Sequence, residues 1–159
     1  MAIYRRILAL ADISANGEAV ARRAAQMALA HNATLAVAAL VDYTPGFECD
    51  HIPFRTPQEM REAIARDVAG KLDDMVARIG LGGAEVIVAG GDTEKASADL
   101  VRSWRPDLVL VGSHAPYGLD VPPRSLIRRD GRLPFDVLIV QMGKPSFTGR
   151  LIQALSAAI

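Results

Sequence analysis

Short apolar runs alternate with helix-like segments along this chain, and this alternation restricts the fold more than any other feature of the sequence. Five runs of four to eight residues are built mainly from Val, Leu, Ile and Ala at consecutive positions. Such runs are typical of strands buried on both faces, as in a parallel sheet covered by helices. We therefore expect strands at residues 7–11, 34–41, 84–89, 108–111 and 135–142.

Apolar residues recur at helical spacing between these runs, which predicts helices over residues 17–31, 56–79, 93–104 and 124–132. The clearest helix start lies at Thr56-Pro57-Gln58-Glu59, which combines a capping box with proline at the first helical position. The helix that follows is expected to bury one continuous apolar stripe. This stripe comprises Met60, Ile64, Val68, Leu72, Met75 and Ile79.

Strands that alternate with helices predict an α/β fold, here a three-layer α/β/α sandwich with a doubly wound five-stranded parallel sheet. Periodicity does not supply the strand order, so 3-2-1-4-5 is a fold-level expectation. In such sheets a ligand binds outside the carboxyl ends of the strands, where the strand order reverses. That rule places the candidate site in a crevice between Asp12 and Gly112.

Composition excludes several classes of protein. The 159 residues carry 18 basic and 18 acidic side chains, and this zero net charge argues against a general nucleic-acid binder. The single cysteine, Cys49, excludes an internal disulfide framework. No apolar run approaches the ~20 residues of a membrane span, and the N-terminal run is too short for a signal peptide. We expect a cytoplasmic protein with one domain over residues 1–142 and a helical extension over residues 143–159.

Four segments resemble the universal stress protein family. Residues 7–14 resemble its first strand with the Asp-x-Ser end, and Gly91-Asp92 matches its Gly-Asp. Residues 107–114 resemble its fourth strand, and residues 136–140 resemble its last strand. The resemblance covers about residues 2–142 and implies an adenine nucleotide alpha hydrolase-like fold. It also implies a nucleotide site that includes Asp12, Ser14, Val41, Gly112, Ser113, His114, Gly118, Arg124 and Ser125.

The phosphate-binding motif departs from that of the family's nucleotide-binding members, which carry Gly-x-x-Gly, nine residues, then Gly-Ser or Gly-Thr. Gly112 matches the first glycine, but Ala115, Ser125 and Leu126 stand at the next three motif positions. If the register slides so that Ser125 supplies the hydroxyl, Arg124 replaces the glycine instead. Prolines also lack the amide hydrogen that a phosphate would need. They stand at residues 116, 122 and 123.

This departure resembles the founding branch of the family, which forms homodimers and lacks the motif. The resemblance therefore implies a non-enzymatic, dimeric stress-response or regulatory protein in which ATP binding is weak or lost. One alternative is an adenine-nucleotide sensor that binds ATP or AMP in the Asp12–Gly112 crevice. A second alternative is a weak nucleotide hydrolase. Asp12 also has a purely structural interpretation as a cap of the first helix, aided by Ser14.

Positive charge is most concentrated on the expected helix 124–132. Arg124, Arg128 and Arg132 recur every four residues and so share one helical face, with Arg129 beside them. One interpretation is an anion site in which side chains hold a phosphate, an acidic partner or a nucleotide. The other is a solvated face paired with nearby aspartates. These are Asp120, Asp130 and Asp136.

The last strand is expected at the sheet edge, where its free hydrogen-bonding groups favour pairing with a second copy of the chain. The tail 146–159 could lie over that partner or over its own subunit, and a further, unidentified protein partner remains possible. The expected dimer residues are Val137, Leu138, Ile139, Val140 and Gln141.

Two other clusters are weaker candidates for chemistry. Ser113 and His114 are neighbours that point opposite ways in an extended chain, so they do not predict a catalytic pair. Glu48, Cys49, Asp50 and His51 lie in one short loop and cannot all reach one metal ion, so no metal site is expected. Whether Cys49 is redox-active depends on its surroundings, which the sequence does not reveal.

Overall fold

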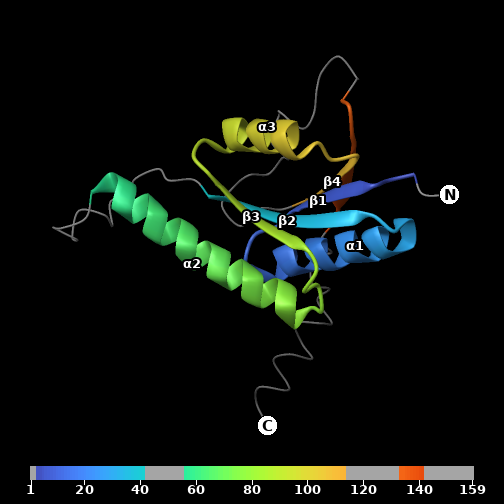
Figure 1. Cartoon of the computed structure of the whole chain (residues 1–159), viewed down its shortest axis with the longest axis horizontal. Coiled ribbons are helices and arrows are strands. Elements are labelled where there is room, and N and C mark those ends of the chain that lie inside the picture. The colour runs from blue at the N-terminus through green and yellow to red at the C-terminus, as the bar shows by residue number, and fades with distance from the viewer. Residues whose placement is uncertain (1–2, 42–55, 114–132, 142–159) are drawn as a thin grey trace, which may run out of the picture.

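A computed structural model describes residues 3–41, 56–113 and 133–141 of the chain (Figure 1). Strands and helices alternate along these residues, as the sequence predicts. The elements are β1 (Arg6–Leu10), α1 (Ala15–His31), β2 (Thr34–Val41), α2 (Pro57–Arg78), β3 (Glu85–Gly90), α3 (Thr93–Trp104), β4 (Leu108–Gly112) and β5 (Asp136–Val140).

All five strands form one parallel sheet in the order β3-β2-β1-β4-β5, which confirms the expected order. The order reverses between β1 and β4, which are direct neighbours with Leu10 opposite Val111. The carboxyl ends of the strands therefore meet at one edge of the sheet and the amino ends meet at the other.

Helices cover both faces of the sheet: α1 and α2 lie on one face and α3 lies on the other (Figure 1). Side chains alternate along each strand between two cores. Ile7 and Ala9 of β1 belong to the core under α1 and α2, whereas Leu8 belongs to the core under α3, with Leu100 and Trp104. This explains why the strand sequences are apolar at consecutive positions rather than at alternate ones.

Helix α1 begins two residues earlier than expected, because Ser14 is its N-cap. Its side chain accepts hydrogen bonds from the first helical amides, as serine commonly does at this position. The helix ends at Asn32, which adopts the left-handed conformation at φ 51° and closes the C-terminus.

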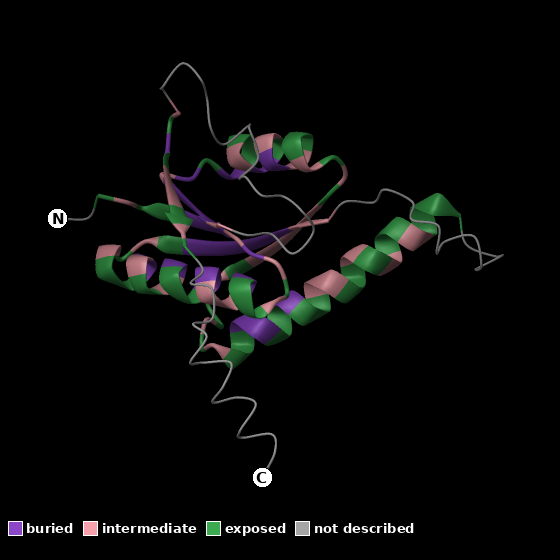
Figure 2. Cartoon of the chain, turned by 180° about the vertical axis from the view of Figure 1, so that it is seen from behind, coloured by how far each residue is buried: buried purple, intermediate pink, exposed green. Residues whose placement is uncertain are grey.

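Helix α2 confirms the predicted capping box at Thr56 and Glu59, but the expectation of a continuous buried stripe is wrong. Only its C-terminal half is buried, at Leu72, Met75 and Val76, whereas Ile64 is 38% exposed. A helix of 22 residues is about 33 Å long, whereas the six residues of β3 beneath it span about 20 Å. The N-terminal half of α2 therefore extends past the sheet (Figure 2).

Several predicted elements lie outside the described residues: the loop 42–55, the helix 124–132 and the tail 143–159. Within residues 3–41, 56–113 and 133–141, none of the helices combines the length and the hydrophobicity that a membrane crossing requires.

Candidate functional site

The strand order brings three of the predicted site residues to the carboxyl edge of the sheet. Asp12 follows the end of β1 by two residues, and Gly112 is the last residue of the adjacent strand β4. Val41 ends β2, which borders β1 on its other side. The structure therefore places Asp12 and Gly112 at the reversal of strand order, where the sequence predicts a crevice.

Asp12 is half-buried and is fixed by hydrogen bonds through only one of its carboxylate oxygens. Asp12 Oδ1 accepts from the backbone N–H of Ser14 at 2.9 Å, from that of Gly17 at 3.1 Å, and from the Ser14 hydroxyl. Asp12 Oδ2 makes no hydrogen bond with a described residue. The structure thus bears out the capping interpretation of Asp12 and also leaves one carboxylate oxygen for another partner.

The side chains of Asp12 and Ser14 already accept hydrogen bonds from two amides in the first turn of α1. The Ser14 hydroxyl accepts from the amides of Asn16 at 3.2 Å and Gly17 at 3.3 Å. A helix N-terminus can hold an anion only through amides that remain free. The Gly17 amide is shared between Asp12 and Ser14, so it is not free for a phosphate.

Gly17 permits the close approach of α1 to Asp12. A Cβ atom added at Gly17 would lie 1.9 Å from the backbone oxygen of Asp12 and 2.5 Å from its Oδ1. Any larger residue would force this helix start away from β1. The position and orientation of Asp12 therefore depend on a glycine five residues later, a role that the sequence analysis did not identify.

The backbone at Ser113 belongs to the sheet. Its amide donates to the carbonyl of Val140 at 3.0 Å, which extends the pairing of β4 with β5. The carbonyl of Val41 accepts from the Gly91 amide at 2.9 Å, and Gly91 takes a positive φ of 119° there. Each of these two strand ends is thus anchored by a neighbouring strand or turn.

The remaining predicted site residues lie outside the described residues, so the proposed basic face and phosphate loop stay predictions. This holds for His114, Gly118, Arg124, Ser125, Arg128 and Arg132, and for the loop cluster around Cys49. In the part of the chain that the structure describes, no three His, Cys, Asp or Glu side chains gather as a metal site would require.

Strand β5 lies at the sheet edge, as expected, and pairs only with β4 among the described strands. Leu138 and Val140 pack against the core under α1 and α2, and Val137 packs against the other core. Ile139 is 45% exposed, and Gln141, just past the strand, is also exposed.

The amino edge of the sheet carries an aspartate with a different role. Asp107, just before β4, accepts through Oδ2 from the amides of Arg5 at 2.7 Å and Arg6 at 2.9 Å. These bonds tie the start of β1 to the start of β4, about one hundred residues apart in sequence. The sequence analysis assigned no role to Asp107 beyond the family resemblance, because nothing local indicates its partner.

Two aromatic residues reinforce the same edge. The Tyr4 hydroxyl donates to Asp136 Oδ2 at 2.8 Å, and this hydrogen bond to a carboxylate raises the pKa of Tyr4 above 10.0. The Arg6 guanidinium lies 4.2 Å from the centre of the Trp104 ring and donates to the Trp104 carbonyl. The indole N–H of Trp104 donates in turn to Glu85 Oε2 at 2.8 Å.

Comparisons with known proteins agree with this architecture. Residues 3–128 match the sequence profile described as the Universal stress protein family. Universal stress protein A homolog 1 of Coxiella burnetii (strain RSA 493 / Nine Mile phase I) is 25% identical over 117 residues, covering 74% of this chain and 81% of that protein.

Two solved structures of the same fold are similar at comparable identity. A universal stress protein in complex with cAMP is 26% identical with a TM-score of 0.53, over 86% of this chain and 96% of that one. A protein from the universal stress protein family of Burkholderia pseudomallei is 25% identical with a TM-score of 0.58, over 88% of this chain and 98% of that one.

Proposed function

The chain belongs to the universal stress protein family, and from this membership we propose that it is a cytoplasmic, homodimeric stress-response protein that regulates partners without catalysis. In this proposal the binding of ATP is weak or lost. The observation that carries the proposal is the replacement of two motif glycines by Ala115 and Ser125 beside an otherwise matching fourth strand.

The loss of ATP affinity follows from the supply of backbone amides. A triphosphate is held by a loop of close-approaching backbone N–H groups, which glycines allow and prolines cannot provide. Two of the described amides beside the crevice, those of Gly17 and Ser113, are already bonded within the protein. These two donors are therefore not available to a chain of phosphates.

The proposal of a non-catalytic protein is supported by the chemistry of the crevice. Among its described residues, Asp12 is the one ionisable side chain, and one of its oxygens is committed to the start of α1. Phosphoryl transfer requires metal ions and cations around the phosphates and a positioned nucleophile. A single carboxylate can ligate a metal ion, but it supplies neither the cations around the phosphates nor the positioned nucleophile.

Dimerisation through β5 is supported by its position at the sheet edge, where it pairs only with β4 among the described strands. An edge strand with exposed apolar side chains is a template for pairing, and twofold dimers are the commonest soluble assemblies. Light scattering should give the mass of two chains for the full protein and of one chain for Ile139→Lys, which alters the exposed apolar side chain on β5. A mass of one chain for the unaltered protein would refute the dimer.

Restoring the motif tests the proposed loss of ATP binding. We expect calorimetry to show no or millimolar binding of ATP to the unaltered chain, and no ATP turnover with magnesium. The triple variant Ala115→Gly, Ser125→Gly, Leu126→Ser restores the family spacing and should bind ATP at least about tenfold more tightly. Equal micromolar binding by both proteins would contradict the proposal, and turnover by the unaltered chain would support the hydrolase alternative.

A second candidate function is the sensing of an adenine mononucleotide such as AMP or cAMP in the same crevice. It is favoured by Asp12, whose Oδ2 is not used within the described residues, and by the similarity to a universal stress protein in complex with cAMP. A mononucleotide needs fewer phosphate contacts than ATP does. Its binding is therefore compatible with the altered phosphate motif.

Titration with AMP, cAMP and ATP separates the two candidates. A mononucleotide sensor should bind AMP or cAMP more tightly than ATP, and Asp12→Asn should weaken this binding. Nucleotide that stays with the purified protein would be detected by ultraviolet absorbance after denaturation. The absence of heat with every adenine nucleotide would exclude the sensor and leave the regulatory proposal standing.

A further inference from the structure

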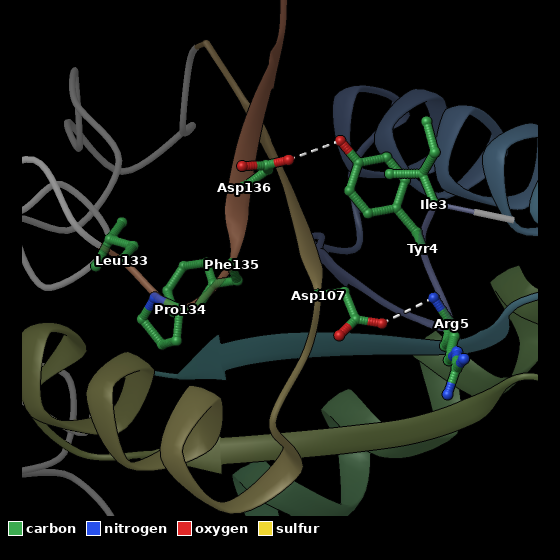
Figure 3. A pocket seen from close by; sticks show the side chains of 8 residues that line it. All are labelled: Ile3, Tyr4, Arg5, Asp107, Leu133, Pro134, Phe135 and Asp136. Carbon is green, nitrogen blue, oxygen red and sulfur yellow. Dashed lines mark hydrogen bonds between the residues drawn. The ribbon is translucent and has the colours of Figure 1, made fainter.

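An open pocket lies at the amino edge of the sheet, at the opposite end of the strands from Asp12 and Gly112 (Figure 3). It has a volume of about 530 Å³, within the size range of small-molecule sites. Its walls come from the segment before β1, the residue before β4 and the start of β5. The lining residues are Ile3, Tyr4, Arg5, Asp107, Leu133, Pro134, Phe135 and Asp136.

Two carboxylates line this cavity, and the protein fixes each through one oxygen only. Asp107 Oδ2 accepts from the amides of Arg5 and Arg6, and Asp136 Oδ2 accepts from the Tyr4 hydroxyl. The Oδ1 atom of each aspartate makes no hydrogen bond with a described residue. These hydrogen bonds hold both carboxylates in a fixed orientation before any ligand binds, while each keeps an oxygen that can accept a further hydrogen bond.

The opposite wall of the cavity is apolar. Leu133, Pro134 and Phe135 form it, as Figure 3 shows, and Phe135 is only 8% exposed because it packs in the core under α3. A ligand in this cavity would therefore contact hydrocarbon on one side and carboxylate oxygens on the other. This combination selects a molecule with an apolar body and a hydrogen-bond donor.

The charge of the lining determines the kind of donor. The lining contains two carboxylates, of Asp107 and Asp136, and one guanidinium, of Arg5. The Arg5 side chain points away from Asp136 in Figure 3 and forms no ion pair with a described residue. An ionised carboxylate only accepts hydrogen bonds, and bonds from a charged donor are about twice as strong as neutral ones. A phosphate or carboxylate ligand would be repelled. A metal ion would find only two carboxylates among the described residues.

We propose that this amino-edge cavity binds a small organic cation, a primary amine on an apolar chain or ring. The ammonium group donates to the free oxygens of Asp107 and Asp136, and the hydrocarbon packs on Leu133, Pro134 and Phe135. The site is separate from the nucleotide crevice and does not depend on the function proposed there.

Calorimetry of the full chain with phenethylamine tests this site, with phenethyl alcohol and phenylacetate as neutral and anionic ligands of similar shape. We expect saturable binding of the amine with a Kd of about 1 mM, and binding of the other two that is at least about tenfold weaker. Equal binding of amine and alcohol, or no saturable binding of the amine, would overturn the proposal.

Two variants assign the binding to this cavity. Asp136→Asn keeps an acceptor for the Tyr4 hydroxyl but removes the charge, and should weaken amine binding by about tenfold or more. Asp73→Asn removes a charge from the exposed face of α2 and should leave amine binding unchanged. An equal effect of both variants would contradict the site. Independently of any variant, the amine should shift the backbone resonances of Tyr4, Asp107 and Asp136 in the unaltered protein, and shifts confined to other residues would also refute it.

Discussion

Asp12 and Asp107 stand at opposite ends of the same sheet, and both accept backbone amides through one carboxylate oxygen. The partners of Asp12 lie two and five residues away, at the start of α1. The partners of Asp107 lie about one hundred residues away, at the start of β1. One aspartate completes a local turn, whereas the other joins two strands that the chain itself does not connect directly.

The sequence separation of these contacts suggests different roles for the two ends of the sheet, with ligand recognition at the carboxyl edge and stability of the fold at the amino edge. A local contact forms whenever its helix forms, so its loss affects one helix start and little else. A contact between distant strands forms only in the folded domain, so its loss acts on the whole fold. The carboxyl edge can therefore change its loops and ligand while the amino edge keeps the strands in register.

Gly17→Ala should produce the largest loss of stability. Its Cβ would overlap the Asp12 backbone, and overpacking against a backbone atom costs up to about 3 kcal/mol. Urea unfolding of this variant would measure the loss, with Gly70→Ala as the control because a Cβ there meets nothing within 4 Å. Gly70→Ala should be neutral or stabilising. If the two variants were equally stable, α1 would not depend on its close approach to Asp12.

Asp107→Ala should destabilise the domain by about 2 kcal/mol, since two amides lose a charged acceptor. Asp12→Ala should cost only about 1 kcal/mol, the usual value for a lost cap, because Ser14 still accepts from the Gly17 amide. Both free energies of unfolding can be measured by urea titration. A larger loss for Asp12→Ala than for Asp107→Ala would reverse the comparison on which the account depends.

Ser14→Ala should cost about 1 kcal/mol or less, since Asp12 continues to accept from the Gly17 amide. The double variant Asp12→Ala, Ser14→Ala should lose more unfolding free energy than the sum of the two single losses, because it leaves the Gly17 amide without a side-chain acceptor. A double-variant cycle in urea measures this coupling. Simple additivity would show that the two residues do not share the cap.

Glu18→Gln should have the smallest effect, and its effect should depend on pH. Hydrogen bonds from Arg22 first, and then from Arg78 on α2, lower the pKa of Glu18 below 4.5. The stabilisation is therefore present above that value and disappears as the pH falls through the lowered pKa. Urea midpoints of the two proteins should differ slightly at about pH 7 and converge as the pH falls below the lowered pKa of Glu18. For Glu62→Gln, which removes a carboxylate without an ion pair in the described residues, we expect no such difference.

The sequence predicted the strands well because each rests on a strong local pattern, whereas the strand order came from a fold-level expectation. Buried parallel strands produce consecutive apolar residues, and the capping box at Thr56 is readable from four letters. The length of the stripe on α2 was overestimated, since periodicity shows which side of a helix is apolar but not where the sheet beneath it ends. Ile64 has the right spacing and is nevertheless exposed.

The site was predictable only in part. Asp12 and Gly112 could be placed together because a doubly wound sheet was expected to have the strand order 3-2-1-4-5, and Ser14 could be recognised as a cap. The roles of Gly17, Tyr4 and Asp107 could not be foreseen, because each depends on the precise approach of another segment. The pairs Tyr4–Asp136 and Arg6–Trp104 leave no signal in sequence spacing.

Titration of AMP into Asp12→Asn and Asp107→Asn tests most directly whether the carboxyl edge of the sheet serves ligand binding and the amino edge serves stability. Asparagine keeps an acceptor oxygen at each site, so both variants can fold. If the crevice binds AMP, as in the second candidate function, Asp12→Asn should weaken this binding by about tenfold while staying nearly as stable as the unaltered chain. Asp107→Asn should bind AMP within about twofold of the unaltered chain although it unfolds at lower urea. Unchanged AMP binding in Asp12→Asn, or equal weakening in both variants, would contradict this division of roles between the two edges.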